Sequence, residues 1–162
     1  MLGAALTGPS KSLAQRIKLE GSKAIEVEYE RAYRTIETDP AAAVTAACAI
    51  LESVCKSYLE LEGHEMPSKQ TLGPLWSTAA EHLGLTPKVV SDDDLKRILQ
   101  GLYSIADGVA ALRTHSGSAH GRSSASRYEV APRHARLAVH AAHTMAMFVL
   151  ETWQARRGTR GC

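Results

Sequence analysis

Arg113 and His120 are the two residues of this sequence whose types and spacing best suit chemistry on a phosphodiester. Six residues separate them, and Gly117 and Gly121 allow the chain to turn back. An imidazole titrates near neutral pH, so it can take a proton from a ribose 2′-hydroxyl or give one to the leaving oxygen. A guanidinium can bind two phosphate oxygens and stabilise the charge that develops on them. Neither step needs a metal ion. A structural histidine, hydrogen-bonded within a turn, is the alternative.

Positive charge gathers in the segment Arg113–Arg136, which contains both residues. The whole chain has 19 Lys and Arg against 17 Asp and Glu, a formal net charge of +2. Within the segment, Glu129 alone opposes five arginines and three histidines: Arg113, Arg122, Arg127, Arg133, Arg136, His115, His120 and His134. Such a segment attracts phosphate or RNA, which makes Arg122 and Arg133 candidate phosphate contacts. The alternative is a solubilised surface loop.

Other polar residues point less clearly to a site. Three imidazoles suit zinc, but the spacing of His115, His120 and His134 matches no ligand pair on one helix face. We therefore predict no metal and no cofactor. His140 and His143 are interpreted as rim or core residues of a helix. The sequence contains no G-x-S-x-G elbow and no glycine-rich phosphate-binding loop.

A wider set of residues resembles the abortive-infection C-terminal domain family, which belongs to the HEPN superfamily of helical ribonucleases. The pair Arg113 and His120, after one long helix and before another, looks like the Arg–His motif of that superfamily. The similarity includes further segments and reaches from about Tyr29 to Trp153. These segments are residues 39–47, 51–56, 98–102, 112–121, 132–139 and 148–153.

The resemblance implies a HEPN-like helical bundle that acts in bacterial phage defence or toxin biology. In active HEPN ribonucleases two protomers pair and both Arg–His sets line a shared cleft, so a homodimer with RNA as its substrate is expected. Arg113 and His120 would be the catalytic residues. The family commonly has Asn or another polar amide after the arginine, whereas this chain has Thr114 and then His115. Both are candidate cleft residues, because Thr114 can still donate a hydrogen bond.

Glu52 and Lys56 have two interpretations. They lie four residues apart on the strongest predicted helix, so they could form a surface ion pair. Since the resemblance includes both positions, they could also line the cleft.

Two functions therefore stay open. The first is a metal-independent RNA endonuclease of HEPN type that works as a homodimer. The second is a non-catalytic helical module that binds RNA, a nucleotide or a partner protein through Arg113–Arg136. An antitoxin or another defence protein is such a partner.

The elements expected to position these residues are helices. Apolar residues recur at three- and four-residue spacing over about Ala41–Leu61 and Asp92–Leu112. Asp39-Pro40 predicts the start of the first helix, and the acidic residues of Ser91-Asp92-Asp93-Asp94 predict the start of the second. A shorter helix is expected from after Thr71 to Gly84. A final helix begins at Pro132 and carries an inward face of Leu137, Ala141, Met145, Phe148, Val149 and Trp153. We predict an all-α, HEPN-like bundle with two or three long helices and a polar loop from Thr114 between the last two.

Length and composition indicate one globular domain over residues 11–157, with flexible ends at 1–10 and 158–162. A loose tail is expected to carry Arg156, Arg157 and Arg160. The chain has 162 residues, 44% hydrophobic and 22% charged. We expect a cytoplasmic protein without a membrane partner, because no apolar run approaches the roughly 18 residues that span a bilayer. Cys48 and Cys55 would lie about 10 Å apart on one helix face, too far for a disulfide, so reduced buried thiols are expected.

Overall fold

The computed structural model describes Ile17 and residues 21–117 and 129–160, and these are largely helical. A short 3-10 helix, η1 (Pro87–Val89), precedes the fourth of the five described α-helices. These helices are α2 (Ser22–Arg34), α3 (Pro40–Leu61), α4 (Leu72–Leu83), α5 (Asp93–Gly117) and α6 (Pro132–Arg160). No described residue lies in a strand. The prediction of an all-α bundle is confirmed.

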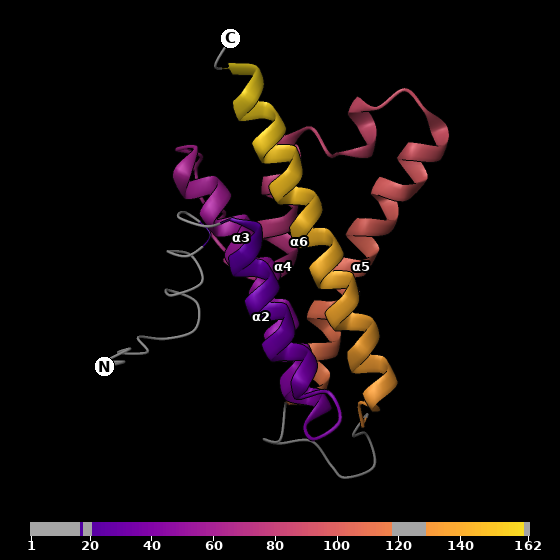
Figure 1. Ribbon diagram of the computed structural model, residues 1–162. Coiled ribbons are helices and arrows are strands. Elements are labelled where there is room, and N and C mark those ends of the chain that lie inside the picture. The colour runs from indigo at the N-terminus through magenta and orange to yellow at the C-terminus, as the bar shows by residue number, and fades with distance from the viewer. Residues whose placement is uncertain (1–16, 18–20, 118–128, 161–162) are drawn as a thin grey trace, which may run out of the picture.

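Helix α3 is central, because it contacts α2, α4, α5 and α6. Helix α6 runs along the bundle with α2 on one side and α5 on the other (Figure 1). The C-terminal ends of α2 and α5 and the start of α6 lie at the same end of the bundle (Figure 1). Residues from three helices therefore meet where the basic segment begins and ends.

The boundaries of α3 follow from its sequence. Asp39 caps the helix, since its side chain accepts a hydrogen bond of 2.9 Å from the backbone N–H of Ala42, and Pro40 occupies the first helical position. At the other end Gly63 adopts a φ of 71°, a conformation that favours glycine. The predicted helix over Ala41–Leu61 is confirmed.

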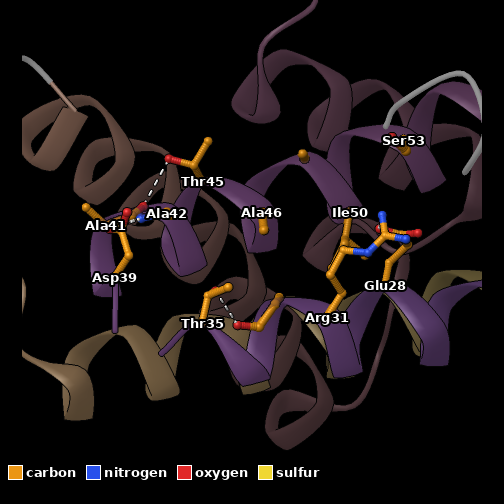
Figure 2. Close-up of a pocket in the computed structure, with 12 residues that line it drawn as sticks. Glu28, Arg31, Thr35, Asp39, Ala41, Ala42, Thr45, Ala46, Ile50 and Ser53 are labelled. Atoms are coloured by element: carbon orange, nitrogen blue, oxygen red, sulfur yellow. Dashed lines mark hydrogen bonds and ion pairs between the residues drawn. The ribbon is translucent and has the colours of Figure 1, made fainter. Parts of the chain in front are cut away.

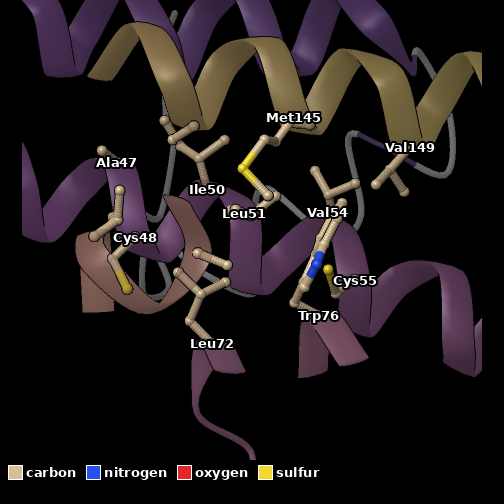
Figure 3. Packing of buried hydrophobic residues seen from close by; sticks show 14 of the residues in the cluster. Ala47, Cys48, Ile50, Leu51, Val54, Cys55, Leu72, Trp76, Met145 and Val149 are labelled. Carbon is tan, nitrogen blue, oxygen red and sulfur yellow. The ribbon is translucent and has the colours of Figure 1, made fainter. Parts of the chain in front are cut away.

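The core lies where α3 meets α6 and α4. Leu51, Val54 and Cys55 of α3 are fully buried and face Met145 and Trp76 (Figure 3). The second thiol of α3, Cys48, is also buried, and neither cysteine forms a disulfide. The prediction of buried, reduced thiols is therefore confirmed. Burial raises the pKa of both thiols to about 12.

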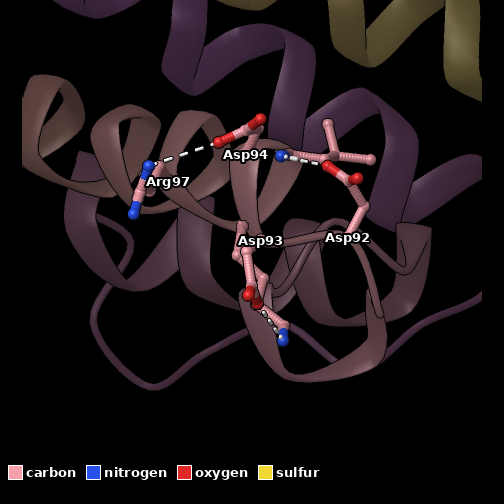
Figure 4. A network of polar contacts seen from close by, with 6 residues as sticks. Asp92, Asp93, Asp94 and Arg97 are labelled. Carbon is pink, nitrogen blue, oxygen red and sulfur yellow. Dashed lines mark hydrogen bonds and ion pairs between the residues drawn. The ribbon is translucent and has the colours of Figure 1, made fainter.

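Helix α5 starts as its acidic residues predict. The carboxylate of Asp92 accepts a hydrogen bond of 2.8 Å from the N–H of Leu95, and Asp94 pairs with Arg97 one turn later (Figure 4). The predicted end is wrong: the helix continues past Leu112 to Gly117.

Two predictions for α6 are also wrong. The sequence predicts a loose tail that carries Arg156, Arg157 and Arg160, but the helix continues to Arg160, and Arg156 donates a 2.6 Å hydrogen bond to the carbonyl oxygen of His82. The sequence also predicts that Leu137 faces inward, but this residue is 71% exposed. Met145, Val149 and Trp153 of the predicted inward face are buried, so the prediction of this face fails at Leu137.

Helix α3 is also long and apolar enough to cross a membrane, by length and composition alone. Two-thirds of its apolar stretch is buried inside the bundle, as in the core helix of a soluble domain.

Candidate functional site

Arg113 lies near the end of α5 and pairs with Glu52 of α3. Its Nη1 is 3.1 Å from Oε1 of Glu52. The arginine side chain is 29% exposed and the glutamate side chain 16%, so water screens this ion pair less than a surface pair. One catalytic candidate is thus fixed to the central helix while part of its side chain remains accessible.

Cys48 also contacts Glu52. Its Sγ lies 3.7 Å from Oε1 of Glu52, one turn earlier on α3. Burial opposes the charge on Arg113, but Cys48 and Glu52 outweigh it and raise the pKa of the guanidinium. Arg113 therefore stays charged at any physiological pH. Since Nη1 contacts one carboxylate oxygen, further N–H groups can bind an anion.

The residues after Arg113 form the last turn of α5. The hydroxyl of Thr114 donates a hydrogen bond of 3.0 Å to the carbonyl oxygen of Ala110, and His115 is exposed. The hydroxyl of Ser116 bonds back to the carbonyl oxygen of Arg113 at 3.3 Å. Thr114 thus directs its hydroxyl proton to its own helix.

The first turn of α6 lies beside this end of α5. Leu112 and His134 line one hollow of about 360 Å³ between the two helices. Arg133 is exposed, and its Nε donates to Nε2 of His134 at 3.2 Å. The structure therefore brings Arg133 to the same end of the bundle as Arg113.

The remaining predicted site residues have three outcomes. The prediction of a surface ion pair between Glu52 and Lys56 is wrong, because the carboxylate of Glu52 pairs with Arg113 of α5. Lys56 is half-buried on α3. His120 and Arg122 lie outside the described residues, so the pairing of Arg113 with His120 stays a prediction.

No group of three or more metal-ligating side chains occurs among the described residues. The three-histidine arrangement considered from the sequence includes His120, which is outside them. His140 and His143 lie at the rim of the bundle against Tyr29 of α2.

A further hollow lies away from Arg113. This pocket of about 630 Å³ lies between α2 and α3, and alanines such as Ala41, Ala42 and Ala46 line it (Figure 2). Its buried carboxylate, Glu28, is paired with Arg31 at 3.2 Å. Its lining contains neither Arg113 nor Glu52.

Sequence reasoning missed two features of this region. The first is the contact of Cys48 with Glu52. The position of Cys48 one turn before Glu52 is the sequence signal for this contact. The second is a set of apolar side chains along α5 and α6, which we name the α5–α6 face. Leu95, Ile98, Ile105 and Leu137 of this face are exposed, and Leu102 and Leu112 are partly buried. In the sequence these residues are indistinguishable from core positions.

Comparison with known proteins identifies the family of this chain. No curated protein and no solved structure matches it. One family model, Abi_C, described as a HEPN-like domain, matches residues 23–153. This match covers most of the chain and agrees with the helical bundle and with the resemblance of the sequence. The protein belongs to the Abi_C family of HEPN-like domains.

Proposed function

We propose that this protein is a metal-independent RNA endonuclease of HEPN type that acts in bacterial phage defence or as a toxin. The observation that supports it most is the state of Arg113. This residue is charged, anchored by Glu52 and partly exposed at the end of α5, which is where the HEPN motif begins in the sequence.

The proposed reaction is a transesterification. The 2′-oxygen attacks the adjacent phosphorus and the bond from phosphorus to the 5′-oxygen breaks. One histidine takes the proton of the 2′-hydroxyl, and a second acid gives a proton to the departing 5′-oxygen. The products carry a 2′,3′-cyclic phosphate and a 5′-hydroxyl. Arg113 stabilises the charge on the non-bridging oxygens.

A homodimer would supply both proton-transfer groups. Each chain contributes one His120, whereas the reaction uses one base and one acid. The α5–α6 face fits this arrangement, because Ile98 is 62% exposed and Leu137 71% exposed, and exposed apolar side chains gathered along one face are typical of interaction sites. This face includes Leu112, which is next to Arg113, so a second copy seated on it would bring two arginines toward one cleft.

An RNA cleavage assay in excess EDTA tests the proposal. The wild type is compared with His120→Ala and Arg113→Ala, and with Arg97→Ala as a control, because Arg97 is an exposed arginine on the same helix. Wild type and control should cut RNA and leave cyclic phosphate ends, whereas the other two variants should lose at least about a hundredfold in rate. Equal cleavage by His120→Ala would overturn the mechanism.

The contacts of Arg113 and Thr114 also favour a second candidate, a non-catalytic binding module. Glu52 neutralises the guanidinium, and the Thr114 proton is directed to Ala110. Such a module would bind RNA, a nucleotide or a partner such as an antitoxin through the basic segment. Binding to RNA would then weaken with salt while no preparation cuts it.

A further inference from the structure

Four aromatic and imidazole rings meet on the surface where α2 lies along α6. Tyr29 is the centre, with its ring centroid 4.2 Å from that of His143 and 5.8 Å from that of His140. Tyr33, one turn further along α2, lies 5.9 Å from Tyr29 and 5.7 Å from His140. We name these four residues the ring cluster. Tyr29 packs against the core, whereas Tyr33 and His140 are exposed.

Hydrogen bonds fix the inner rings and leave Tyr33 available. The hydroxyl of Tyr29 lies 2.8 Å from Nδ1 of His140, and Nε2 of His143 lies 3.1 Å from Oε1 of Glu26. Tyr33 is 41% exposed although two rings touch it. The cluster is therefore a rigid base that presents the Tyr33 ring, beside the exposed His140, to solvent.

The ring cluster continues into a ridge of basic side chains. On α6, Arg133, Arg136, His140 and His143 follow a spacing of three, four and three residues, so they share one side of the helix. Arg34 is exposed one residue after Tyr33 on α2. The ridge begins at the end of the bundle that carries Arg113 and runs away from it along α2.

Most carboxylates near the rings form ion pairs or hydrogen bonds with basic side chains. Glu26 pairs with His143, and Glu37 pairs with Arg136. Glu30 is exposed on the same helix as the tyrosines. Arg133 and the ion-paired Arg136 thus lie at the start of α6, and the rings follow as the apolar end.

We propose that the ring cluster is a second contact site for the RNA substrate, where an unpaired base stacks on Tyr33 and His140 while flanking phosphates bind Arg133 and Arg136. This inference rests on the proposed function and adds a substrate class to it, namely single-stranded RNA. Aromatic rings beside a basic groove are the usual means of holding single strands without reading sequence, because every base has a π-face. The ridge links this platform to the cleavage end.

Binding by variants that cannot cut RNA tests the site. In a His120→Ala background, a fluorescein-labelled single-stranded RNA of about twelve nucleotides should bind, since this length suits known single-strand sites. Adding Tyr33→Ala should weaken binding about tenfold, and Tyr33→Phe should restore it. Leu61→Ala is the control, because Leu61 is as exposed as Tyr33 and lies on α3. An abasic strand should bind the protein with Tyr33 and the Tyr33→Ala variant with equal affinity.

The outcomes separate the site from the function. If the His120→Ala protein binds no RNA, the proposed function fails and this inference fails with it. If it binds RNA but Tyr33→Ala binds equally well, the platform is overturned and the proposed function survives. An equal loss on the abasic strand would also overturn the platform, because the effect would not come from stacking. Urea unfolding of Tyr33→Ala and Tyr33→Phe verifies that both variants are folded.

Discussion

The two sides of α6 differ in how completely they are covered. Toward α3, residues such as Met145 and Val149 are buried against a helix with fully buried apolar positions. Toward α5, large aliphatic side chains remain exposed, and two hollows of about 500 and 360 Å³ separate the helices. The α3 side therefore holds the fold together, whereas the α5 side leaves apolar surface uncovered.

The same leucine truncation on each side should give the largest contrast. Leu51→Ala removes a fully buried side chain of α3 and should cost about 3 kcal/mol of unfolding free energy, because it leaves a cavity. Leu137→Ala should change it by about 0.5 kcal/mol or less, since little packing is lost. Urea denaturation at low protein concentration measures both. Equal losses of unfolding free energy would mean that the two sides of α6 contribute equally to stability.

The buried thiols on the α3 side should make the fold sensitive to alkali. The pKa of Cys48 and Cys55 is raised from 9.0 to about 12, so both are protonated in the folded state and ionise more readily when unfolded. Their contribution is complete below pH 9 and is lost as pH rises toward 12, by up to about 1.4 kcal/mol per pH unit for each thiol. A Cys48→Ala/Cys55→Ala variant should show a shallower decline in melting temperature over this range. An identical slope would contradict the assignment.

A charge placed on the α5 side should act on association instead. In the proposed homodimer, Leu137→Glu buries an unpaired carboxylate, so the dimer should weaken at least tenfold, which corresponds to about 1.4 kcal/mol. Sedimentation velocity over a dilution series measures this change. Glu151→Gln is a milder control, because Glu151 lines the far end of the same face. A wild type that stays monomeric at every concentration would refute the dimer.

The sequence predicts the helices better than it predicts the contacts between them. Asp39-Pro40 and the apolar spacing locate α3 within a residue of its observed start, because these signals are local. The contact of Glu52 with Arg113 could not be predicted, since it depends on how α5 crosses α3. For the same reason the sequence does not distinguish exposed Leu137 from buried Met145 on α6.

The end of α5 was missed for a local reason. Thr, Ser and Gly are weak helix formers, so residues 114–117 read as a loop. In the structure the hydroxyls of Thr114 and Ser116 bond back to carbonyl oxygens of the preceding turn, and the helix continues through them. The extension carries His115 one turn beyond the predicted end.

The smallest expected effects come from the two helix caps. Asp39 and Asp92 each accept one backbone hydrogen bond, of 2.9 and 2.8 Å. Asp39→Ala should cost about 1 kcal/mol of global stability, because the first turn of α3 leads directly into buried Ala43 and Val44. Asp92→Ala should cost about half as much, since Leu95 and Ile98 in the first turns of α5 are exposed and the helix can fray without unfolding the core. Amide hydrogen exchange distinguishes the two: faster exchange confined to the start of α5 in Asp92→Ala indicates local opening, whereas a uniform increase would show that α5 is as firmly coupled to the core as α3.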